Sequence, residues 1–120
     1  MRKRDELDTP MSVSKTLCRL DAIPDGNALA VDVASSTGGF NLVLLRHGER
    51  VFAYHNECPH AGRHLDFAPG RFLVSGARIV CAVHGATFAV ESGECVGGPC
   101  RNGLVRIPVD VSDGEVRLAR

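Results

Sequence analysis

Two short segments of the chain each combine one cysteine with one histidine. Cys58 and His60 lie two positions apart, and Cys81 and His84 lie three positions apart. Thiolate sulfur and imidazole nitrogen bind zinc and iron, and both spacings allow a pair to converge on one centre. A single zinc ion would take all four donors in a tetrahedron. A [2Fe-2S] cluster with mixed ligands would take the cysteines on one iron and the histidines on the other. Spacing alone leaves both centres open.

The elements that must position these donors are predicted to be short strands. Helical periodicity is weak, and 13 glycines and 6 prolines divide the chain into short segments separated by turns. The pattern is typical of an all-β domain. The predicted strands are residues 15–20, 29–33, 40–46, 51–55, 72–75, 78–81, 87–90, 104–111 and 115–119. Predicted hairpin turns at 47–50, 75–77 and 112–114 imply antiparallel pairing.

Two stretches rich in glycine and proline, residues 59–70 and 93–103, are predicted to be loops. Loops at one end of a packed antiparallel scaffold are a common way to present metal ligands. With 120 residues the chain has the length of one ordinary domain.

Charge and hydropathy exclude several classes of partner. Lys and Arg number 14, as do Asp and Glu, so no basic field favours nucleic acid or an anionic membrane surface. The longest apolar runs, 42–45 and 79–83, fall far below the roughly 18 residues needed to span a bilayer. No apolar segment follows the basic N-terminus, which argues against a secretory signal. We therefore expect a cytoplasmic protein with no membrane partner.

The residues around the four donors form a specific composite pattern. It reads C-P-H-A-G at 58–62, Leu65, C-A-V-H-G at 81–85, Phe88, Gly93 and G-P at 98–99. This pattern resembles the Rieske [2Fe-2S] domain, strongly over 58–104 and through the strand pattern over most of 13–118. The gap between His60 and Cys81 is a few residues longer than is usual in the family. We place the extra residues in a turn at 69–71.

The resemblance implies a fold and a ligand set. The expected fold is an all-β, Rieske-type iron-sulfur domain of stacked antiparallel sheets with a two-loop cluster-binding subdomain. Residues 1–11 would be a disordered charged tail, residues 12–120 the domain, and about 56–103 the cluster-binding loops. One [2Fe-2S] cluster per chain would be held by Cys58 and Cys81 on one iron and by His60 and His84 on the other.

The resemblance also implies an electron carrier with no catalytic residues of its own. The expected protein is a soluble, low-potential ferredoxin that takes single electrons from an NAD(P)H-dependent flavoprotein reductase. Its expected acceptor is a terminal oxygenase of the aromatic-ring dioxygenase type. The histidines left over, His47, His55 and His64, all lie in or before the cluster loops, which leaves no place for a mononuclear iron held by two histidines and a carboxylate.

Two alternatives stay open at this point. One is a non-catalytic iron-sulfur small subunit of a larger reductase, such as assimilatory nitrite reductase, whose large subunit would then be the partner. The other is a zinc-stabilised interaction module.

Three further cysteines are not predicted ligands. Cys18 is expected to be a buried structural thiol. Cys95 and Cys100 flank a Gly-Gly-Pro turn and could form a disulfide, but the absence of an export signal favours two free thiols. His55 and His64 are expected to pack or to lie at the surface.

The reduction potential is predicted to lie at the low end of the Rieske range. High-potential members have a loop disulfide and two hydroxyl groups, from Ser and Tyr, that hydrogen-bond to sulfur. The matching positions here are Arg63 and Val83 for the disulfide and Ala86 and Phe88 for the hydroxyls. Fewer hydrogen bonds to sulfur leave the reduced state less stabilised. A redox titration followed by EPR is expected to give a potential below about +100 mV, and a higher value would contradict this reasoning.

Overall fold

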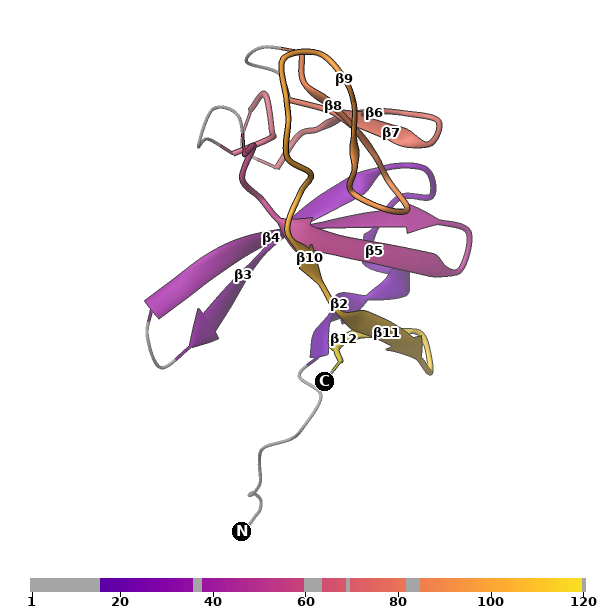
Figure 1. Cartoon of the computed structure of the whole chain (residues 1–120). Coiled ribbons are helices and arrows are strands. Elements are labelled where there is room, and N and C mark those ends of the chain that lie inside the picture. The colour runs from indigo at the N-terminus through magenta and orange to yellow at the C-terminus, as the bar shows by residue number, and fades with distance from the viewer. Residues whose placement is uncertain (1–15, 36–37, 60–63, 69, 82–84, 120) are drawn as a thin grey trace, which may run out of the picture.

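The computed structural model describes residues 16–35, 38–59, 64–68, 70–81 and 85–119, and these form three antiparallel sheets (Figure 1). The central sheet has the order β10 (Arg106–Ile107), β5 (Arg50–His55), β4 (Gly38–His47), β3 (Ala28–Ser35). The lower sheet has the order β11 (Val109–Ser112), β12 (Glu115–Leu118), β2 (Thr16–Arg19). The upper sheet has the order β6 (Leu73–Ser75), β7 (Arg78–Val80), β8 (Thr87–Ala89), β9 (Cys95–Gly97). The predicted all-β, antiparallel architecture is confirmed.

Helix is minimal in this part of the chain. The described residues contain one three-residue 3-10 helix, η1 (Leu20–Ala22). None of their helices has the length and apolar character needed to cross a bilayer.

Strand β4 is buried on both of its faces. Leu42 and Leu44 point into the lower core, which the central sheet shares with the lower sheet. Val43 and Leu45 point into the upper core, which the central sheet shares with the upper sheet. All four side chains are at most 1% exposed. Because alternate residues of a strand face opposite sides, a strand covered on both sides must be continuously apolar, which accounts for the run at 42–45.

Tyr54 of β5 links the central sheet to the upper sheet. Its side chain is fully buried in the upper core, and its hydroxyl donates a 2.6 Å hydrogen bond to the carbonyl oxygen of Val90. Burial raises the pKa of Tyr54, which keeps the hydroxyl protonated as a donor. Gly93 lies against the ring: a Cβ at this position would be 2.7 Å from Tyr54 Cε1. Only glycine fits at this contact without a shift of the ring.

The predicted strand over 104–111 is two strands in different sheets. β10 pairs with β5 in the central sheet, whereas β11 pairs with β12 in the lower sheet. Pro108 lies between them and has no N–H to continue a ladder. The chain therefore crosses from one sheet to the next at this residue.

The predicted loop over 93–103 contains a strand. β9 pairs with β8, with Gly97 opposite Thr87 and Cys95 opposite Phe88, across a register shift. A three-residue strand in a glycine-rich stretch lacks the apolar alternation that would have revealed it. The predicted hairpin turns are confirmed, since β4–β5, β6–β7 and β11–β12 are antiparallel pairs joined at these positions. Pro69, the first residue of the turn predicted at 69–71, lies outside the described residues; beside it, the N–H of Arg71 donates to the carbonyl of Ala68 at 2.8 Å.

Asn56 closes the base of the first predicted ligand loop. Asn56 is only 2% exposed, and its Oδ1 accepts a 2.8 Å hydrogen bond from the N–H of Leu65. Its Nδ2 donates to Asn41 Oδ1 at 2.6 Å and to Asp66 Oδ1 at 3.2 Å. Asp66 Oδ2 in turn accepts from the N–H of Gly70 at 3.0 Å. One amide therefore ties both ends of the loop to β4.

We expect Asn56→Ala to lower the free energy of unfolding by about 1–3 kcal/mol, because the buried Leu65 N–H loses its acceptor. The measurement is urea unfolding followed by far-UV circular dichroism. The matched control is Asn102→Ala, at an exposed asparagine, for which we expect a change within about 0.5 kcal/mol. Identical unfolding curves for Asn56→Ala and the unmodified protein would contradict the role given to Asn56.

Candidate metal centre

Two thiols from separate hairpins meet in one core. Cys58 follows β5 after a two-residue connection, and Cys81 follows β7 directly. Both residues are 0% exposed and belong to the upper core, together with Leu65, Ala86 and Phe88. The structure thus brings together the two predicted sulfur ligands. His60 and His84, the predicted nitrogen ligands, lie outside the described residues.

Backbone hydrogen bonds close the second loop at Cys81. The N–H of Cys81 donates to the carbonyl of Ala86 at 2.7 Å, and the N–H of Gly85 donates to the carbonyl of Cys81 at 3.0 Å. Gly85 has φ +78°, which glycine adopts without the strain that a side chain would cause. Gly85 and Ala86, which lead into β8, are therefore held next to Cys81.

The donor chemistry fits an iron-sulfur centre. Buried thiols with apolar neighbours become good ligands when a metal takes their protons, and the metal then compensates the buried negative charge. Ala86 and Phe88, both fully buried here, bring no hydroxyl to this region. Within the described ranges, which leave out His60 and His84, no group of three or more His, Cys, Asp and Glu side chains is placed to hold a metal ion.

The two described histidines near the loops have other contacts. His55 stacks on Phe40, with ring centroids 5.4 Å apart and planes 5° from parallel. His64 has a side chain 62% exposed, with Nδ1 3.7 Å from Asp66 Oδ1. One packs and the other lies at the surface, as expected from the sequence.

The preference for two free thiols at Cys95 and Cys100 is wrong in this structure, where they form a disulfide. β9 and the turn after it bring the two Cα atoms to 6.0 Å, within the range that a disulfide requires. Cys18 is only half-buried, against the lower core. Burial, and secondarily the Asp21 carboxylate, raise the pKa of the Cys18 thiol, so it stays protonated and unreactive at neutral pH.

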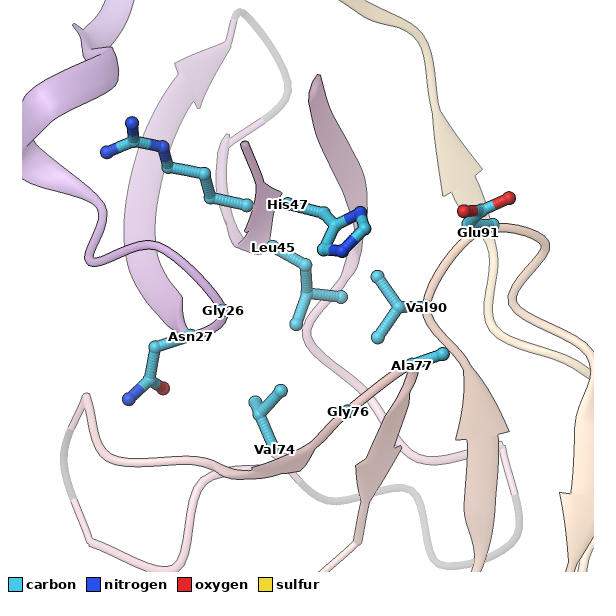
Figure 2. A pocket seen from close by; sticks show the side chains of 10 residues that line it. Gly26, Asn27, Leu45, His47, Val74, Gly76, Ala77, Val90 and Glu91 are labelled. Carbon is cyan, nitrogen blue, oxygen red and sulfur yellow. The ribbon is translucent and has the colours of Figure 1, made fainter. Parts of the chain in front are cut away.

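A small, partly open pocket has no cysteine in its lining. It has a volume of about 40 Å³, which is room for a few water molecules, and it lies between the end of β4 and the β6–β7 turn. Figure 2 shows the apolar side chains of Leu45, Val74 and Val90 in its lining, to which His47 and Glu91 also belong. No candidate ligand lines it, so it is not the chemical site.

Sequence reasoning missed Asn56 as a residue that positions the site. A polar residue directly after a strand and two positions before a predicted ligand was the available signal, since asparagine side chains commonly bond to nearby backbone in turns. Its partners Asn41 and Asp66 have no such signal, because they become neighbours only when β4 and the loop pack together.

Comparisons with known proteins agree with this geometry. The sequence model of the Rieske [2Fe-2S] domain matches residues 14–108. The 3-phenylpropionate/cinnamic acid dioxygenase ferredoxin subunit of Escherichia coli is 25% identical over 99 residues, which cover 82% of this chain and 86% of the relative.

Solved structures show the same fold. The ferredoxin of carbazole 1,9a-dioxygenase from Nocardioides aromaticivorans is 26% identical, with a TM-score of 0.72 over 90% of this chain and 98% of the neighbour. A complex of oxygenase and ferredoxin of carbazole 1,9a-dioxygenase contains a chain 25% identical, with a TM-score of 0.73 over 91% of this chain and 94% of that one. A nitrite reductase small subunit, 18% identical with a TM-score of 0.69 over 90% of this chain and 99% of its own, shares the fold.

The family match decides between the two centres that spacing left open, because a Rieske domain holds one [2Fe-2S] cluster rather than a zinc ion. The match covers residues 14–108, most of the chain, and both buried cysteines, Cys58 and Cys81, lie within it. This chain belongs to the Rieske [2Fe-2S] domain family.

Proposed function

We propose that this chain is a ferredoxin that carries single electrons from an NAD(P)H-dependent flavoprotein reductase to a terminal oxygenase of the aromatic-ring dioxygenase type. The likeness to the ferredoxin subunit of a dioxygenase over 82% of the chain carries the proposal. The structural neighbour found in complex with an oxygenase supports the same partner. A cytoplasmic location agrees with a nicotinamide-dependent donor.

The proposed ligands are Cys58 and Cys81 on one iron and His60 and His84 on the other. The proposed domain spans residues 12–120, with cluster loops at about 56–103 and a tail at 1–11. When bound, the cluster supplies a centre that accepts and releases one electron. The chain's own part is to exclude water from the two thiols and to hold their loops closed through Asn56 and through the Cys81–Ala86 hydrogen bond.

The small subunit of a nitrite reductase remains a competing function with the same fold. At 18% identity that likeness speaks for architecture alone. The two functions differ in how the chain binds: a shuttle must release its partners, whereas a subunit stays bound.

The ligand assignment predicts opposite results for two histidines in the same region. His84→Ala is expected to abolish the visible absorption and EPR spectrum of a mixed-ligand cluster, because one iron loses a nitrogen donor. His64→Ala is expected to keep both spectra, because His64 has a largely exposed side chain beside Asp66. Loss of the spectrum in His64→Ala together with its retention in His84→Ala would show that the wrong histidine was assigned.

The electron-carrier function predicts that a reconstituted dioxygenase system depends on this chain. We expect product formation from NADH, a flavoprotein reductase and an aromatic-ring oxygenase to require it, and to fall to background with Cys81→Ser. Binding to the oxygenase should be weak and should decrease with added salt, since exposed charges are screened. Stable co-purification with one large reductase subunit, without any support of oxygenase turnover, would overturn the proposal in favour of the nitrite reductase type.

A further inference from the structure

A disulfide closes a loop at the cluster end of the molecule. Cys95 begins β9, and its bond to Cys100 encloses the turn at Gly97, Gly98 and Pro99. We call residues 95–100 the cystine loop. The first half of this loop is fixed by the pairing of β9 with β8, and the chain after it is fixed by a 2.8 Å hydrogen bond from the N–H of Leu104 to the carbonyl of Gly93. The disulfide constrains the stretch between these two anchors.

The cystine loop packs against the segment that follows Cys81. A Cβ at Gly98 would lie 2.5 Å from the carbonyl oxygen of Gly85 and 2.8 Å from Cα of Ala86. These are backbone atoms that cannot rotate away, so the two segments are in direct contact and only glycine permits it. Movement of the cystine loop therefore changes the support of the second ligand loop.

The same loop reaches the first ligand segment. Pro99 and Pro59 line one surface groove, together with Arg101 and Asn102. Pro59 follows Cys58 directly. The cystine loop thus lies beside both segments that carry the proposed sulfur ligands, and its covalent closure limits the conformations of the loop that these segments adjoin.

The surroundings of the two sulfurs suit a dithiol as well as a disulfide. Sγ of Cys100 lies 3.2 Å from the carbonyl oxygen of Gly97, and Sγ of Cys95 lies 3.1 Å from the carbonyl oxygen of Cys100. Neither sulfur carries a hydrogen in the disulfide; on reduction the two sulfurs move apart, and these carbonyl oxygens are nearby acceptors for S–H groups, which are weak donors. Both residues are half-buried, whereas Cys58 and Cys81 are 0% exposed. A small thiol reagent therefore reaches the cystine and not the ligand pair.

We propose that Cys95 and Cys100 are a reversible thiol–disulfide modification site, which exchanges with low-molecular-weight disulfides of the glutathione type and determines how firmly the cystine loop supports both ligand loops. The inference rests on the ligand assignment proposed above. In the oxidising direction one cysteine thiolate attacks the small disulfide and releases one small thiol. The second cysteine then displaces the other small thiol, so two electrons and two protons pass from the protein to the reagent.

The test uses the intact protein with its cluster, equilibrated without oxygen in defined mixtures of oxidised and reduced glutathione. Accessible thiols are then blocked with a maleimide and counted by mass spectrometry. We expect Cys95 and Cys100 to become labelled together as the mixture becomes more reducing, while the cluster absorbance is retained. Independent labelling of the two residues, or a bond that never forms in any mixture, would overturn the proposal.

A second readout measures the support of the ligand loops. We expect loss of the cluster to an iron chelator to be roughly tenfold faster in the dithiol form, because the short loop is no longer constrained. Cys95→Ser/Cys100→Ser should show the fast rate in every glutathione mixture, and Cys18→Ser should behave as the unmodified protein. Equal rates in the two forms of the unmodified protein would contradict the coupling. Protein without a cluster in either form would overturn the ligand assignment instead, and the inference with it.

Discussion

The burial of strand β4 on both faces is the constraint on which the rest of the structure depends. Leu42 and Leu44 hold the lower sheet, while Val43 and Leu45 hold the core under the cluster end. Full burial of each such side chain contributes roughly 1.5–3 kcal/mol. β5 and β7, from which the two proposed ligand loops start, pack on the same upper core. A change in β4 therefore reaches the positions of both buried cysteines.

Specific bonds close the loops at the end of the molecule that carries Cys58 and Cys81. Asn56 joins the two ends of the first loop, and the Cys81–Ala86 hydrogen bond closes the second. The cystine loop is closed covalently and contacts the second loop through Gly98. The described ends of the two proposed ligand loops are thereby held in place, which would keep the ligands oriented around a centre that changes its charge.

Several features of the fold were predictable because they depend on local chemistry. Turn residues at 47–50, 75–77 and 112–114 mark real hairpins, since glycine permits the backbone angles that such turns require. The two errors in the strands share one cause. Composition predicts one strand over 104–111 and one loop over 93–103. In the structure, the first range divides at Pro108 into two strands that pair in different sheets. The second contains β9, which hydrogen-bonds to β8. The disulfide was not predictable in this way, because the sequence does not give the distance between Cys95 and Cys100.

The sequence alone determined the candidate donor atoms, the all-β class, the family resemblance and the positions of the hairpin turns. These follow from residue type and from spacing along the chain. Only the tertiary structure decided that Asn56 hydrogen-bonds across the first loop to Leu65, that Gly98 must lack a side chain and that Cys95 is bonded to Cys100. Each of these depends on a contact whose geometry is set by how strands pack across the sheets. Spacing along the chain does not encode that packing.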